Sequence, residues 1–186
     1  MMALTAECVE LTVHVAKLPQ QPPFRFITGV VSLKELDLPL KGVTVEAYLD
    51  VTQEMCAGHF PDALIFPGVL LEEALGQTGC LALSCHADFS ERDMLPMWNG
   101  PRSIEQNHSV FPEDRVRLRC SFVFEEEEEG RIQGRMRGQA FVTNGKGNEV
   151  EAMGMSANFL LVAKRVMMRM ANMERVLRTA RRSVAA

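Results

Sequence analysis

The stretch VLLEEALGQTGCLALSC, residues 69–85, decides the fold. It is rich in Leu and Ala, which favour a helix, and Pro67-Gly68 directly before it suits a helix start. A helix that is apolar on nearly every side must also be buried on nearly every side. A curved antiparallel sheet wrapped around the helix would bury it in this way. The sequence therefore predicts the α+β class.

The segments on both sides of this helix predict the sheet. β-Branched and aromatic residues dominate 24–33, and residues 43–51 alternate apolar and polar side chains as a half-buried strand does. A loop is expected at 86–103. Three further strands are then predicted at 116–124, 132–143 and 149–162. Hairpin turns are expected between them at 125–130 and 144–148. The expected architecture is about five strands around one long helix.

The domain organisation is expected to be simple. One domain is predicted over residues 1–163, with a lead-in at 1–23 that ends in the breaker PQQPP. Residues 164–186 predict a basic amphipathic helix, because apolar residues recur at spacings of three and four opposite an arginine-rich face. Three roles remain open for this helix: packing on the sheet or a second subunit, docking of an acidic partner, or attachment to a membrane surface.

Composition narrows the class of protein. The chain has 186 residues, 47% hydrophobic and 24% charged, which suits one compact domain, and its net charge of −4 argues against nucleic acid as a partner. The five cysteines form no C-x-x-C pair and the N-terminus lacks a signal-peptide pattern, so we expect a cytoplasmic protein. No apolar run reaches the ~18–20 residues that cross a bilayer, so no transmembrane segment is predicted.

Several polar residues are expected to be structural. His14, His86 and His108 stand apart without the spacing of metal ligands, and no metal site is predicted. The five glutamates at 125–129 predict a solvated hairpin tip. Cys80, on the central helix, predicts a small apolar residue of the core.

The segment before the helix, GHFPDALIFPG at 58–68, places a histidine at the approach to a helix N-terminus. Two prolines and Gly68 restrict the chain here, so His59 is expected on a rigid turn. The first backbone N–H groups of a helix have no partner within it. Those of Gly68 and Val69 can therefore bind an incoming carbonyl oxygen.

Two carboxylates follow on the helix, and only one of them shares a face with Gln77. Glu73 lies one turn before Gln77, whereas Glu72 is rotated by ~100° from Glu73. A histidine base, a carboxylic acid and N–H donors form a working set for removing a proton next to a carbonyl. If the substrate carries a β-hydroxyl, this set eliminates water: the histidine takes the α proton and the acid protonates the departing hydroxyl. Burial favours the protonated acid that this step needs.

GHFP at 58–61, followed by FPGVLLEEALGQ at 66–77, resembles the active-site segment of the hot-dog-fold 3-hydroxyacyl-acyl carrier protein dehydratases, GHFPxxPxxPGVLxxEAxAQ. The resemblance is specific over about residues 43–80 and looser in the strands beyond. It implies the hot-dog fold. It also implies dehydration of a 3-hydroxyacyl thioester to the trans-2-enoyl thioester, in fatty acid or polyketide-like biosynthesis.

The resemblance assigns roles to individual residues. His59 and Glu73 fall on the catalytic histidine and acid, and Gly68, with Val69 beside it, on the amides that hold the thioester carbonyl. Gln77 falls on the polar residue beside the acid, and Phe60 and Pro67 are expected to support the site. The implied substrate is carried on acyl carrier protein or coenzyme A, and no cofactor is implied. A homodimer or higher oligomer is implied, in which the histidine of one subunit faces the acid of the other.

The sequence departs from the family pattern at two positions before the helix and at one position within it. Asp62 replaces a glycine, Leu64 replaces the middle proline, and Gly76 replaces an alanine. Asp62 predicts a turn residue rather than a catalyst. The related dehydratase-isomerases carry aspartate at the acid position, so Glu73 favours plain dehydration. Two alternatives stay open: a hot-dog acyl-thioesterase, and a non-catalytic subunit that binds acyl groups or the acyl carrier.

Overall fold

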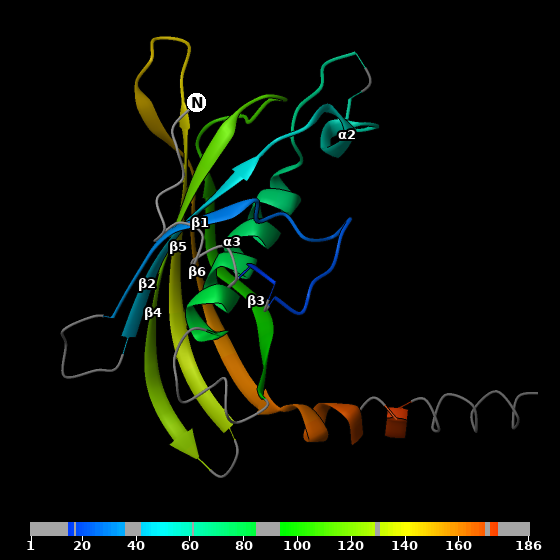
Figure 1. The fold of residues 1–186 in the computed structure, drawn as a ribbon, viewed down its shortest axis with the longest axis vertical. Coiled ribbons are helices and arrows are strands. Elements are labelled where there is room, and N and C mark those ends of the chain that lie inside the picture. The colour runs from blue at the N-terminus through cyan, green and yellow to red at the C-terminus, as the bar shows by residue number, and fades with distance from the viewer. Residues whose placement is uncertain are drawn as a thin grey trace, which may run out of the picture.

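The computed structural model describes residues 15–16, 18–35, 42–60, 62–84, 94–128, 131–169 and 172–174. An antiparallel sheet of six strands, in the order β1-β2-β4-β5-β6-β3, curls around the helix α3, Gly68–Ser84 (Figure 1). A short helix α2, Gln53–Cys56, precedes α3. The strands are β1 Gly29–Glu35, β2 Gly42–Asp50, β3 Met94–Gln106, β4 Arg115–Glu128, β5 Arg131–Thr143 and β6 Glu149–Ala163.

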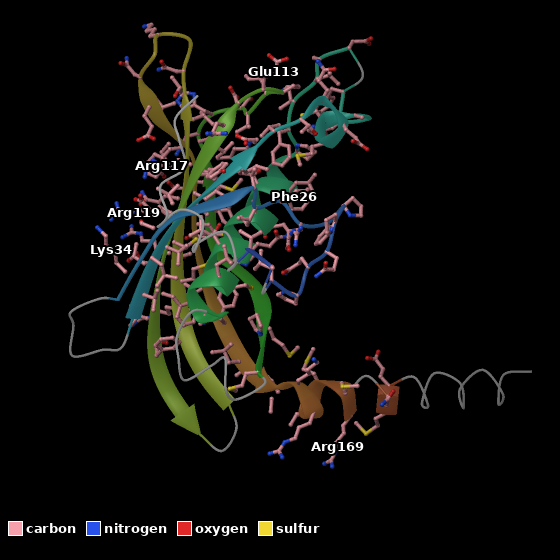
Figure 2. All side chains as sticks on the ribbon, viewed as in Figure 1. Phe26, Lys34, Glu113, Arg117, Arg119 and Arg169 are labelled. Carbon is pink, nitrogen blue, oxygen red and sulfur yellow. The ribbon has the colours of Figure 1, made fainter. Side chains whose placement is uncertain are left out.

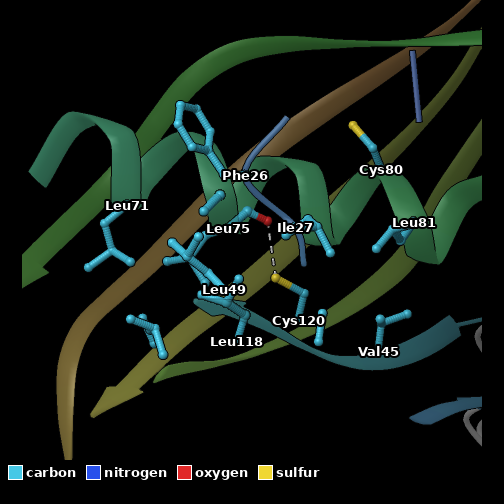
Figure 3. Packing of buried hydrophobic residues seen from close by; sticks show 14 of the residues in the cluster. Phe26, Ile27, Val45, Leu49, Leu71, Leu75, Cys80, Leu81, Leu118 and Cys120 are labelled. Carbon is cyan, nitrogen blue, oxygen red and sulfur yellow. Dashed lines mark hydrogen bonds between the residues drawn. The ribbon is translucent and has the colours of Figure 1, made fainter. Parts of the chain in front are cut away.

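The core lies between α3 and the concave face of the sheet. Leu71, Leu75 and Leu81 of the helix are at most 1% exposed, and they face inward-pointing residues of β2 and β4 such as Leu49 and Leu118 (Figure 3). Cys80 is buried too, as predicted. On the outer face, Lys34, Arg117 and Arg119 point away from the helix (Figure 2). The prediction of a buried central helix within a curved sheet is confirmed.

The prediction of a loop over 86–103 is wrong in its second half. Strand β3 begins at Met94 and pairs with β6 along its length, although its register shifts twice around Pro101. β3 is the last strand of the sheet, and an edge strand tolerates proline because one row of its backbone groups needs no partner within the sheet. Within the described residues the sheet therefore has six strands, where the sequence predicted about five.

Two element boundaries also differ from the predictions. The expected strand at 24–33 starts only at Gly29, because the backbone at Phe24 and Phe26 bonds to a side chain of α3 instead of to a strand. The glutamates at 125–128 belong to β4 rather than to a hairpin tip, and Glu125 forms an ion pair with Arg135 across the strands. The turn at 144–148 is as expected: Asn144 Oδ1 accepts from two backbone N–H groups there.

The chain continues into helical turns at 164–169 and 172–174 after β6 (Figure 1). Val166, Met168 and Met173 of these turns are exposed. Val166 and Met173 belong to the apolar stripe expected to pack, so in the described part of this segment they do not pack on the chain's own sheet. The rest of the predicted C-terminal helix, and most of the lead-in at 1–23, lie outside the described residues. Within the described residues, no helix has the length and hydropathy to cross a membrane.

Candidate active site

His59 is held in one orientation by the turn that follows α2. Thr52 caps that helix, since its Oγ1 accepts from the N–H of Met55, and the N–H of His59 donates to Cys56 O at 3.1 Å. The ring Nδ1 lies 2.9 Å from the carbonyl oxygen of Ile65. A carbonyl oxygen only accepts, so Nδ1 carries the proton of the neutral ring and Nε2 keeps its lone pair. His59 therefore presents a free basic nitrogen.

Phe60 adopts an uncommon backbone conformation beside the histidine. Its φ is 58°, in the left-handed region that a bulky side chain rarely adopts, and Gly58 on the other side of His59 has φ 83°. The Phe60 ring centroid lies 4.3 Å from that of the His59 ring. Phe60 thus flanks one side of the imidazole.

The segment between His59 and the helix is fixed by its backbone. Phe66 is buried and its N–H donates to Val110 O at 2.8 Å, while Pro67 O accepts from the N–H groups of Leu70 and Leu71 as the helix starts. Two of the three departures from the motif lie in this segment. Asp62 is exposed in a turn, and Leu64 packs partly buried against the core.

The first two N–H groups of α3 are available for binding. Gly68 is the first residue of the helix and Val69, whose side chain is 70% exposed, is the second. In the part of the chain that the structure describes, no group accepts a hydrogen bond from either N–H. Unsatisfied N–H groups at a helix start carry partial positive charge. This pair can therefore hold a carbonyl oxygen.

Gln77 is completely buried and orients Glu73. Its Oε1 accepts from the N–H of Phe26 at 2.9 Å, and its Nε2 donates to Phe24 O at 2.8 Å and to Glu73 Oε1 at 2.9 Å. A backbone N–H only donates and a carbonyl only accepts, so these two contacts fix which way round the amide lies. The amide N–H must then face Glu73 Oε1. This contact occupies Glu73 Oε1 and leaves Oε2 without a contact to Gln77.

Glu72 differs from its neighbour, because among the described residues it has no such partner. It is half-buried, and burial, together with the nearby charge of Glu73, raises the pKa of its carboxyl. The two glutamates project from α3 about 100° apart. Only Glu73 is part of the hydrogen-bonded group around Gln77.

The structure brings together some of the predicted site residues but not all of them. Glu73 contacts Gln77, while His59 contacts Phe60 and the backbone of Ile65. No hydrogen bond joins His59 to Glu73 within the described residues of this single chain. The histidine and the acid therefore form two halves, each internally ordered.

One polar side chain at the start of α3 was not predicted from the sequence. The carboxamide of Gln106, the last residue of β3, lies over Gly68: a Cβ on Gly68 would be 3.2 Å from Gln106 Cδ and would collide with Oε1. Gln106 ends a strand whose first part the sequence predicted as loop, at 86–103, and the sequence assigned no element to Gln106 itself. No motif pointed to it, because its position depends on the pairing of β3 with β6.

A hollow of about 560 Å³ lies at the β5–β6 hairpin, lined by His108, Asp114, Asn144 and their neighbours, and none of the predicted site residues lines it. Among the described residues, no cluster of three or more His, Cys, Asp or Glu side chains could hold a metal ion.

The fold and the site together define a class of protein, the hot-dog-fold proteins. A dehydratase heterocomplex, ApeI:P from Xenorhabdus doucetiae, aligns with 85% of this chain and 97% of its own at a TM-score of 0.60 and 14% identity. A thioesterase superfamily member from Thermus thermophilus, TTHA0967, aligns with 75% of this chain and 95% of its own at a TM-score of 0.53 and 14% identity. The predicted hot-dog fold is confirmed.

Sequence comparison narrows the class to a family. Residues 18–147 match the model of the FabA-like domain, so the chain belongs to that family. It is 32% identical over 137 residues to the 3-hydroxyacyl-[acyl-carrier-protein] dehydratase FabZ of Actinobacillus pleuropneumoniae serotype 5b, covering 72% of this chain and 82% of that protein. It is 30% identical over 120 residues to the FabZ of Nitratidesulfovibrio vulgaris strain DP4, covering 63% and 74%. The resemblance noted in the sequence is confirmed.

Proposed function

We propose that the protein dehydrates 3-hydroxyacyl thioesters carried on acyl carrier protein to trans-2-enoyl thioesters. One observation carries this proposal: His59 and Glu73 are prepared for opposite proton transfers. The contact with Ile65 O leaves His59 Nε2 as a base, and the contact of Gln77 with Oε1 orients Glu73 and leaves its Oε2 available for proton transfer to the substrate. Membership of the FabA-like family and the names of the FabZ relatives support the substrate class.

The reaction follows from the positions of these groups. The thioester carbonyl accepts hydrogen bonds from the Gly68 and Val69 N–H groups, which stabilise negative charge as it develops on the oxygen. The lone pair of His59 Nε2 takes the α proton. The electron pair of the broken Cα–H bond forms the new double bond while the bond from Cβ to the hydroxyl breaks. Glu73 protonates the departing hydroxyl, so water leaves. The cycle closes when the proton on His59 returns to Glu73, and no step requires oxidation or reduction.

The complete site, in this proposal, is formed by two copies of the chain. His59 and Glu73 do not contact each other in the single chain, and β3 leaves one edge of the sheet open. Phe60, Val69 and Ile104 expose apolar side chains around the helix start and on β3. We propose a homodimer in which His59 faces Glu73 of the partner subunit. Burial of these apolar side chains would favour such an interface.

The carrier and the location of the protein also belong to this proposal. Acyl carrier protein is preferred to coenzyme A because the FabZ relatives are named for that carrier, and cytoplasmic fatty acid or polyketide-like biosynthesis is the proposed setting.

A direct assay tests the function. The full chain is incubated with 3-hydroxybutyryl-acyl carrier protein and with saturated butyryl-acyl carrier protein, while enoyl absorbance and free thiol are followed separately. We expect enoyl thioester from the first substrate and no thiol from either. Thiol release without enoyl product would instead indicate a thioesterase. A protein that binds the carrier and converts neither substrate would be a non-catalytic subunit.

A further inference from the structure

The end of β3 is tied to the start of α3 through backbone contacts. Gln106 pairs with Met153 of β6, and the N–H groups of Asn107 and His108 both donate to Ala152 O. Four residues after Gln106, Val110 O accepts from Phe66 N–H, two residues before the helix begins. The pairing with β6 and the contact of Val110 with Phe66 therefore hold Gln106 beside the N-terminus of α3.

The side chain of Gln106 uses the space that Gly68 leaves open. A Cβ on Gly68 would lie 3.4 Å from Gln106 Nε2 and would collide with Oε1, so both polar atoms of the carboxamide lie close to the first residue of α3. Among the described residues, no hydrogen bond partner is found for this carboxamide. Its terminal torsion is soft, so the amide can turn to present either atom.

We propose that Gln106 is a further substrate-positioning residue of this site, whose Nε2–H donates to the thioester carbonyl oxygen bound by Gly68 and Val69. This inference rests on the proposed function, in which that oxygen gains negative charge as the α proton leaves. A third donor at the oxygen stabilises the enolate-like transition state more than the neutral substrate, so it raises kcat more than it lowers KM. The ligand class is the carbonyl of an acyl thioester.

Two variants of Gln106 and one matched control test the role in turnover. Gln106→Leu keeps the size but removes the donor, and Gln106→Glu places a carboxylate beside the developing negative charge. Gln133→Leu makes the first change on an exposed residue of β5 that belongs to no proposed site. We expect kcat to fall about 10–100-fold in Gln106→Leu, further in Gln106→Glu, and not in Gln133→Leu. If Gln106 had only a structural role, Gln106→Glu would not have a lower kcat than Gln106→Leu, because Glu has nearly the shape of Gln and the position is exposed.

Carbonyl polarisation gives a second readout that does not need turnover. The variants bind trans-2-butenoyl-pantetheine labelled with ¹³C at the carbonyl carbon, and its chemical shift is compared between the free and the bound thioester. We expect a downfield shift on binding to the wild-type chain and to Gln133→Leu, and a smaller one on binding to Gln106→Leu. If the ¹³C shift on binding to Gln106→Leu is as large as on binding to the wild-type chain, the inference is overturned, even if kcat falls.

The two readouts separate this inference from the proposed function. If the wild-type chain binds the labelled thioester but dehydrates nothing, the proposed function fails while the ¹³C shift still decides the role of Gln106. If the wild-type chain binds no acyl thioester, both fail. Equal kcat in the wild-type and Gln106→Leu chains overturns the inference and leaves the proposed function standing.

Discussion

At the residue scale, single hydrogen bonds decide what His59 and Glu73 can do. The carbonyl of Ile65 places the imidazole proton on Nδ1, and the amide of Gln77 occupies Oε1 of the acid. The same two side chains without these partners could hold their protons on either atom. The proposed roles of His59 and Glu73 therefore depend on two uncharged partners, the carbonyl of Ile65 and the amide of Gln77.

The adjacent glutamates of α3 offer a matched pair of variants. We expect Glu73→Gln to lower kcat by about 10²–10⁴-fold, because the amide cannot protonate the departing hydroxyl. Glu72→Gln changes the same atoms one residue earlier and should retain dehydration. Steady-state rates with 3-hydroxybutyryl-acyl carrier protein, with circular dichroism to verify folding, check both. A folded Glu73→Gln chain with normal kcat would exclude Glu73 as the acid.

Replacing Gln77 should affect both stability and rate. Gln77→Met leaves the Phe26 N–H, the Phe24 carbonyl and Glu73 without their partner, so we expect a loss of about 1–3 kcal/mol in the free energy of unfolding and a lower kcat. Thr78→Val is the control, because among the described residues this buried hydroxyl bonds only to Ala74 O of the same helix. Urea denaturation and kcat are measured for both. Unchanged kcat in Gln77→Met would show that Glu73 needs no orientation.

At the element scale, Arg117 of β4 joins β2 and β6 across the outer face of the sheet. Arg117 of β4 donates to both carboxylate oxygens of Glu149 on β6, at 2.8 and 2.7 Å, and also reaches Glu46 on β2. The Arg117 guanidinium lowers the pKa of Glu149. Ion pairs on the outer face of the sheet thus connect the same strands whose inner faces pack together in the core.

This arginine makes part of the stability depend on pH. The pKa of Glu149 is lower in the folded chain than in the unfolded one, so its contribution is full above the unfolded value of about 4.3 and is lost as pH falls through the folded value. We expect Glu149→Gln to cost about 0.2–1 kcal/mol at pH 7, a small effect because the pair is exposed. The difference from wild type should close below about pH 4 and shrink in high salt, measured by urea denaturation. If the difference in unfolding free energy between wild type and Glu149→Gln grew as the pH fell, the lowered pKa of Glu149 would be contradicted.

At the scale of the whole molecule, the proposed site needs two chains. His59→Ala and Glu73→Gln are each expected to be inactive as homodimers. Co-expression of the two variants should restore about one quarter of wild-type activity, because about half of the dimers are mixed and each mixed dimer has one complete site. Separately purified and unmixed variants are the control. Mixed dimers without activity would show that each site lies within a single chain.

Much of the fold follows from local patterns, and the exceptions have physical reasons. The central helix was predicted at 69–85 and lies at Gly68–Ser84, because its apolar residues leave no face for solvent. β3 was missed because Pro96, Gly100 and Pro101 disfavour a strand locally, while hydrogen bonds to β6 offset that preference. Residues 24–28 have strand-like composition, yet Phe24 and Phe26 bond to Gln77.

The sequence by itself determined which chemical groups this protein carries. The order of His59, Gly68, Glu73 and Gln77 along one segment indicated the family and the reaction, because residue types and short spacings are local properties. Only the tertiary structure decided which groups orient His59 and Glu73 and what surrounds the helix start. Gln77 meets Phe26 across 51 positions of the chain, and Gln106 reaches Gly68 only after β3 pairs with β6. Contacts between residues so far apart arise from the packing of the whole sheet around α3, which no short stretch of sequence specifies.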